Sequence, residues 1–92
     1  MAIEQYETDA IIPPGESLSE ELEVRGISPR EFAKQLGVSS RFMNGLLLGD
    51  KPLTAEVALK MEQVLGISAR TWLNLETFYR LQLAKRKQAK SA

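Results

Sequence analysis

The sequence predicts an all-α domain of five helices, and three observations support this prediction. Apolar residues recur at spacings of three and four, the period of one helix face, in successive segments of the chain. Serine, threonine or proline precedes these segments, and glycine follows all but the last of them. A chain of 92 residues also has room for only one domain.

Each predicted helix is justified by its ends and by its apolar face. Residues 1–12 show no periodicity and end at consecutive prolines, so we expect an acidic, extended leader before a domain over 13–84. The helices are expected over 16–25, 29–36, 40–48, 55–65 and from 69 to about 84, with Ser28, Ser39, Thr54 and Ser68 as caps of the last four. Ser28 and Glu31 have the spacing of a capping box. The basic residues 85–92 are expected to fray.

Composition excludes several classes of function. The sequence contains no cysteine and no histidine, which removes disulfides, the usual ligands of zinc, copper and iron, and the commonest catalytic base. No spacing of serine, lysine, tyrosine or carboxylates suggests a catalytic set, so we expect neither an enzyme nor a cofactor. No apolar run approaches the roughly 18 residues that span a membrane. We expect a cytoplasmic protein.

The charge is zero overall but unevenly distributed. Residues 1–23 carry acidic side chains and no lysine or arginine, whereas residues 80–92 carry basic side chains and no acid. Any contact with nucleic acid must therefore be local rather than a property of the whole surface.

The most informative stretch runs from Ser28 to Gly49. Two short helices are separated by only residues 37–39, which is too little chain for antiparallel packing, so they must cross steeply. This is the helix-turn-helix geometry, in which the second helix enters the major groove of DNA. Small Ala33 suits a close helix contact, and Gly37 permits a positive φ in the turn. The wedge between the helices is expected to contain Leu36, Val38, Met43 and Leu46.

The start of the second helix of this motif predicts the residues that read DNA. Ser40, Arg41 and Asn44 should point outward, with Gly45 leaving open space beside them. Arginine pairs bidentately with guanine, asparagine pairs with adenine, and serine serves either. Arg30, Lys34 and Lys51 flank this surface and could hold phosphates, although each could also be a solvated charge. Ser39 is included in the interface, although capping alone explains it.

The last helix carries more apolar residues than one face can hold. We expect Trp72 in the core with Leu75 and Tyr79 on its face. The candidates for contact between subunits are then Leu73, Phe78 and Leu81. A homodimer would place two reading helices about 34 Å apart on two half-sites.

Four segments carry a resemblance to a known family. They are IPPGESLSEELEVRGIS at 12–28, REFAKQLGVS at 30–39, PLTAEVALKMEQVLG at 52–66 and TWLNLETFY at 71–79. Through them the chain resembles HigA-type antitoxins, which are Xre-like helix-turn-helix repressors related in fold to phage λ repressor. Gly45 and Leu48 depart from the polar or basic residues that relatives often have, and Pro29 replaces a common glutamine.

The resemblance implies a five-helix λ-repressor-like domain that dimerises and binds double-stranded DNA at an operator in its own promoter. It also implies a partner, a small basic toxin ribonuclease that cleaves messenger RNA. Two alternatives remain open. The first is a stand-alone transcriptional regulator without a toxin. The second is a protein-interaction module with a weakened DNA site, which Gly45, Leu48 and the zero net charge favour.

Overall fold

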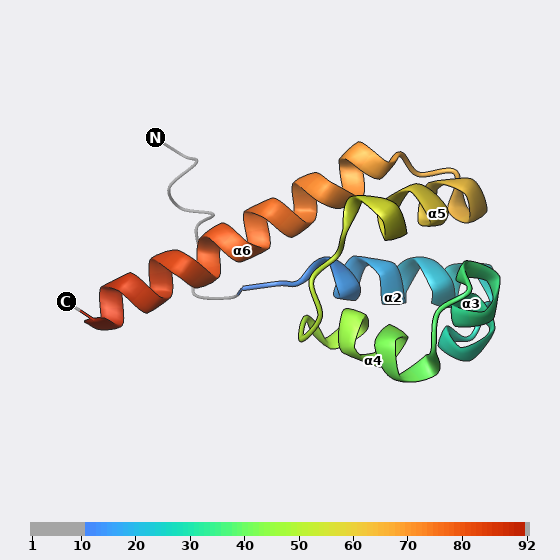
Figure 1. Ribbon diagram of the computed structural model, residues 1–92, viewed down its shortest axis with the longest axis horizontal. Helices are drawn as coiled ribbons and strands as arrows, with labels where there is room; N and C mark the ends of the chain where they lie inside the picture. The colour runs from blue at the N-terminus through green and yellow to red at the C-terminus, as the bar shows by residue number, and fades with distance from the viewer. Residues whose placement is uncertain (1–10, 92) are drawn as a thin grey trace.

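The computed structural model describes residues 11–91, and these residues form five α-helices and no strand (Figure 1). The helices are α2 (Pro14–Arg25), α3 (Pro29–Leu36), α4 (Ser40–Leu48), α5 (Ala55–Leu65) and α6 (Ala69–Ser91). The predicted all-α class and the number of helices are therefore confirmed. The first ten residues of the expected leader lie outside the described part of the chain.

Local signals explain where the helices begin and end. The hydroxyls of Ser28, Ser39 and Thr54 each accept a hydrogen bond from the backbone N–H three residues later, at 3.1, 2.9 and 3.3 Å. These bonds satisfy N–H groups that have no partner within the helix. At the other ends, the stop glycines all take positive φ, which glycine adopts at little cost.

Helix α2 begins two residues earlier than the sequence suggested. It starts at Pro14 rather than at Glu16, and Pro13 takes the cap position with an extended backbone. Proline suits the first position of a helix because its φ is already helical and its missing N–H would have no partner there. The Pro-Pro-Gly stretch therefore starts the helix instead of preceding it.

The core forms where α2 lies between α4 on one side and α5 and α6 on the other (Figure 1). Helix α3 packs across the end of this arrangement against α4 and α5. The largest fully buried side chains are Phe32, Leu18, Leu22, Met43 and Met61. They come from α2, α3, α4 and α5, so a single core fixes the position of each short helix.

Helix α6 differs from the prediction at its end and on its inner face. It continues without interruption to Ser91, past the expected boundary at residue 84, and its second half projects beyond the other helices (Figure 1). Lysine, arginine, glutamine and alanine are good helix formers, and cations stabilise a helix carboxyl end.

Among residues 11–91, no helix combines the length and the apolar character that a membrane span requires.

The inner face of α6 contains Trp72, Glu76 and Tyr79, all of them buried. Their spacing of four and three is that of one helix face. Leu75 also has the spacing of this face relative to Trp72 and Tyr79, but it is 37% exposed and so lies at the edge of the face rather than in the core. Hydrophobicity alone could not show that a glutamate occupies the inner position.

Candidate nucleic-acid interface

The pair α3 and α4 has the geometry predicted for a helix-turn-helix. Gly37 takes φ 74°, and the N–H of Val38 bonds to the carbonyl of Ala33 at 3.0 Å, which closes the turn. Leu36, Met43 and Leu46 are buried in the wedge, and Val38 is partly buried against them. The steep crossing leaves the start of α4 at the surface.

A shallow concavity of about 520 Å³ lies between the first residues of α3 and the outer face of α4. It is lined by Ser28, Pro29, Arg30, Ser40 and Asn44. Helix N-termini carry a partial positive charge and unpaired N–H groups, which favour anions such as phosphate. The surface thus combines two helix starts, a guanidinium and an amide that can pair with a base.

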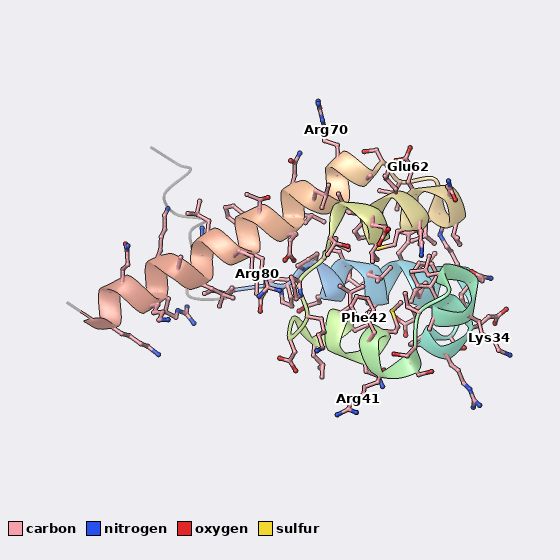
Figure 2. The ribbon with its side chains drawn as sticks, in the orientation of Figure 1. Lys34, Arg41, Phe42, Glu62, Arg70 and Arg80 are labelled. Carbon is pink, nitrogen blue, oxygen red and sulfur yellow. The ribbon has the colours of Figure 1, made fainter. Side chains whose placement is uncertain are left out.

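The residues predicted to read DNA are exposed on this surface. Ser40, Arg41 and Asn44 are all accessible, and Arg41 points away from the body of the molecule below α4 (Figure 2). Lys34 also points outward, from α3 (Figure 2). Ser39 caps α4, because its hydroxyl accepts a hydrogen bond from the N–H of Phe42, and the residue remains exposed.

Gly45 does not leave open space, which corrects the sequence-based expectation. A Cβ atom at Gly45 would lie 2.6 Å from Cγ of Lys51. The Gly45 carbonyl also accepts hydrogen bonds from the N–H groups of Asp50 and Lys51, at 2.8 and 3.1 Å. The loop after α4 therefore folds back, and the Lys51 side chain lies across Gly45. Sequence spacing could not show this contact, because it depends on the path of the loop.

Leu48 lies at the last turn of α4 and is 70% exposed. The loop that follows α4 therefore does not cover the Leu48 side chain. An exposed leucine at the end of a reading helix can contact a thymine methyl group or a partner protein.

The outer side of α6 carries an exposed apolar strip. Phe78 and Leu81 are 58% and 49% exposed, and Leu75, at the edge of this strip, is 37% exposed. Leu83 is also exposed, but it follows Tyr79 by four residues and so continues the inner face of α6 beyond the core. Leu73, the third predicted contact residue, is instead partly buried against the core of its own chain. The contact between subunits through Phe78 and Leu81 stays a prediction, and the exposure of Leu75 and Leu83 could not be told from core positions without the fold.

Among the described residues, no group of acidic side chains could hold a metal ion.

The comparisons with known proteins agree with the helix-turn-helix geometry of α3 and α4. The chain is 36% identical over 73 residues to an uncharacterised helix-turn-helix transcriptional regulator, YddM of Escherichia coli K12, covering 79% of this chain and 78% of the relative. It also matches the structure of an addiction module antidote protein of the HigA family from Coxiella burnetii, with 33% identity, a TM-score of 0.80 and coverage of 88% and 89% of the two chains. This chain belongs to the HigA family.

A second solved structure places DNA beside a HigA protein. The Pseudomonas aeruginosa antitoxin HigA, solved with the higBA promoter, shares 31% identity with this HigA-type chain at a TM-score of 0.82, covering 89% of this chain and 90% of that one. No protein-family model matches the chain. The relatives are regulators and antidotes rather than enzymes, which confirms the expectation of a non-enzymatic protein.

Proposed function

We propose that this HigA-type chain is a sequence-specific repressor that binds an operator in its own promoter. The observation that carries the proposal is the exposure of Arg41 and Asn44 on α4, next to the concavity at the start of α3. These are side chains that can pair bidentately with guanine and adenine, presented where a helix-turn-helix meets base edges. Ser40 adds a third polar group. A DNA-binding regulator of this kind acts in the cytoplasm.

Phosphate contacts position the reading helix. Arg30 and Lys34 project from α3, and Lys51 follows α4, so basic groups flank the reading residues on both sides. With few such groups per subunit and no net charge on the chain, one subunit gains little from electrostatic attraction. Binding of two half-sites by a homodimer supplies the missing affinity, and the exposed strip on α6 supplies the contact between subunits.

We also propose that the chain is the antitoxin of a toxin–antitoxin pair, with a small basic ribonuclease as its partner. The support is the family: the Coxiella burnetii relative is an addiction module antidote protein, and the Pseudomonas aeruginosa relative is an antitoxin. Exposed Leu48 favours a different candidate, a protein-interaction module with a weakened DNA site. A stand-alone regulator would bind DNA in the same way without a toxin.

Fluorescence anisotropy separates these candidates. The purified protein is titrated against its own upstream DNA and against a scrambled duplex, across a series of salt concentrations. A repressor binds the upstream DNA selectively, and its affinity falls linearly with salt on logarithmic axes. Weak, equal binding to both duplexes would contradict DNA reading and favour the protein-interaction module. Co-purification with the product of an adjacent gene for a small basic protein then tests the antitoxin role.

A further inference from the structure

The carboxyl end of the reading helix lies directly against α6. Gly49, which ends α4, is buried and takes φ 86°. A Cβ atom there would lie 2.7 Å from the hydroxyl oxygen of Tyr79 and 2.9 Å from Cβ of Pro13. The carbonyl of Gly49 accepts a hydrogen bond from Nη2 of Arg80 at 3.3 Å. Tyr79 and Arg80, which are consecutive in α6, therefore both contact the residue that ends the reading helix.

Arg80 is itself held in place by its own helix. Its Nε donates to Oε2 of Glu76 at 2.7 Å, and its guanidinium lies 4.8 Å from the centre of the Tyr79 ring. The side chain of Glu76 is only 10% exposed, and a buried carboxylate is costly without such a partner. Figure 2 shows Arg80 on the side of α6 that faces the other helices. Its direction toward Gly49 is thus determined by one turn of α6.

The same turns of α6 carry the exposed apolar strip on their other side. Phe78 and Leu81 flank Tyr79 and Arg80 in the chain, and both are exposed. Within four residues, α6 therefore contacts the reading helix on its inner side and offers an apolar surface on its outer side. A displacement of this segment of α6 would move the end of α4.

We infer that Arg80, held by Glu76, is a positioning residue for DNA recognition. It fixes the end of α4 against the segment of α6 that joins the subunits, and so sets the direction of the two reading helices relative to each other. The inference rests on the proposed function, because it requires DNA reading by α4 and a dimer through α6. It assigns Arg80 a role distinct from phosphate binding.

The test compares the full-length variants Arg80→Met and Arg80→Lys with the wild type. Arg70→Met is the matched control, because it removes the same charge from the exposed start of the same helix, on the side away from Arg41 (Figure 2). Anisotropy gives affinities for the upstream and scrambled duplexes across a salt series. Sedimentation gives the dimer mass, and circular dichroism gives the melting temperature.

Arg80→Met is expected to weaken binding to the upstream duplex by about tenfold, the size of a typical coupling between sites, with the salt slope and the dimer mass unchanged. Arg80→Lys should recover part of the loss, since an ammonium can still reach Glu76 or the carbonyl. Arg70→Met should change neither affinity by more than about twofold. A folded, dimeric Arg80→Met variant that binds like the wild type would overturn the inference. So would an equal loss on both duplexes with a shallower salt slope, because that outcome identifies a phosphate contact.

An NMR measurement keeps this inference separate from the proposed function. Amide spectra of the free protein should show the Gly49 signal displaced in Arg80→Met and unmoved in Arg70→Met. If the wild type shows no selectivity for its upstream DNA, the proposed function fails, while a displaced signal still supports the contact on its own. An unmoved Gly49 signal contradicts the positioning role whatever the DNA result.

Discussion

At the scale of single residues, the proposed reading surface combines exposed polar side chains with a position that has no side chain. Arg41 and Asn44, which we propose contact bases, are exposed because the opposite side of α4 packs into the core through Met43 and Leu46. Gly45 lies beside them, and the stem of the Lys51 side chain packs against it. Substitutions at the exposed polar residues and at Gly45 should therefore both change DNA binding.

We expect Arg41→Ala and Asn44→Ala each to cost about 1–3 kcal/mol of discrimination between the operator and a scrambled duplex. The loss arises because each variant removes one bidentate pair with a base while leaving the buried face of α4 intact. Anisotropy measures the loss, and circular dichroism checks that helicity is preserved. Arg70→Ala serves as the charge-matched control. Unchanged operator affinity in both reading variants would refute this placement of the reading surface.

Gly45→Ala should weaken DNA binding, with a gain in helix propensity that a close contact with Lys51 opposes. Alanine is favoured over glycine inside a helix by roughly 0.5–1 kcal/mol. The new methyl group would lie 2.6 Å from Cγ of Lys51, near the backbone end of that side chain, so the stem must move at a cost that offsets this gain. The ammonium would then leave the position from which we propose that it contacts phosphate. Urea unfolding should show less than the full gain in stability, and anisotropy should show weaker operator binding.

The control for this prediction is the same change in a Lys51→Ala background. There the added methyl group has nothing to displace, so Gly45→Ala should weaken operator binding no further. Equal losses in the two backgrounds would show that Gly45 acts independently of Lys51.

At the scale of elements, α3 and α4 depend on their surroundings. They have only 8 and 9 residues, and helices this short are marginal in isolation. Their caps and their contacts with α2 and α5 hold them. One close contact of this kind lies at Gly15, in the first turn of α2. A Cβ atom there would overlap the carbonyl oxygens of Leu46 and Leu47.

Gly15→Ala is therefore expected to destabilise the fold by about 1–3 kcal/mol or more, as overpacking does in other cores. The clash is with backbone atoms, which cannot rotate away, so α2 or α4 must shift. Unfolding in urea can be followed by the fluorescence of Trp72, the single tryptophan, which is buried. Gly45→Ala makes the same chemical change in α4 but meets only a side chain. If the two variants are equally stable, α2 and α4 are not packed as closely as described.

At the scale of the whole molecule, α6 extends beyond the other helices, so much of its surface has no contact within the monomer. Phe78 and Leu81 on its outer side are exposed, with Leu75 at the edge of the same strip, and a chain of this size can bury only a small core. Contiguous exposed apolar residues are typical of an interaction site. We propose a second copy of the chain as the occupant, because a dimer would bind two half-sites on DNA.

Phe78→Asp should shift the dimer toward monomer in sedimentation velocity, because it would bury a charge in an apolar contact. Operator affinity should fall with it, since each monomer then binds one half-site alone. Val24→Asp is the matched control: Val24 is 83% exposed on α2, away from this strip. A Phe78→Asp protein that stays dimeric would exclude this surface as the contact between subunits.

Local signals in the chain were sufficient for the five helices, the turn at Gly37 and the exposure of Arg41 and Asn44. Caps, stop glycines and the period of 3.6 act over a few residues, so they can be recognised without knowing what lies beyond them. The start of α2 and the end of α6 differ from the boundaries expected from the sequence, because helix termini depend on small differences in free energy.

The tertiary structure alone decided which distant residues come into contact. Lys51 reaches Gly45 through the path of a loop, Arg80 reaches Gly49 across 31 positions of the chain, and Glu76 rather than Leu75 turns inward. Such contacts arise from the angles at which helices cross. Those angles follow from the packing of the whole core, which no single segment of the sequence specifies.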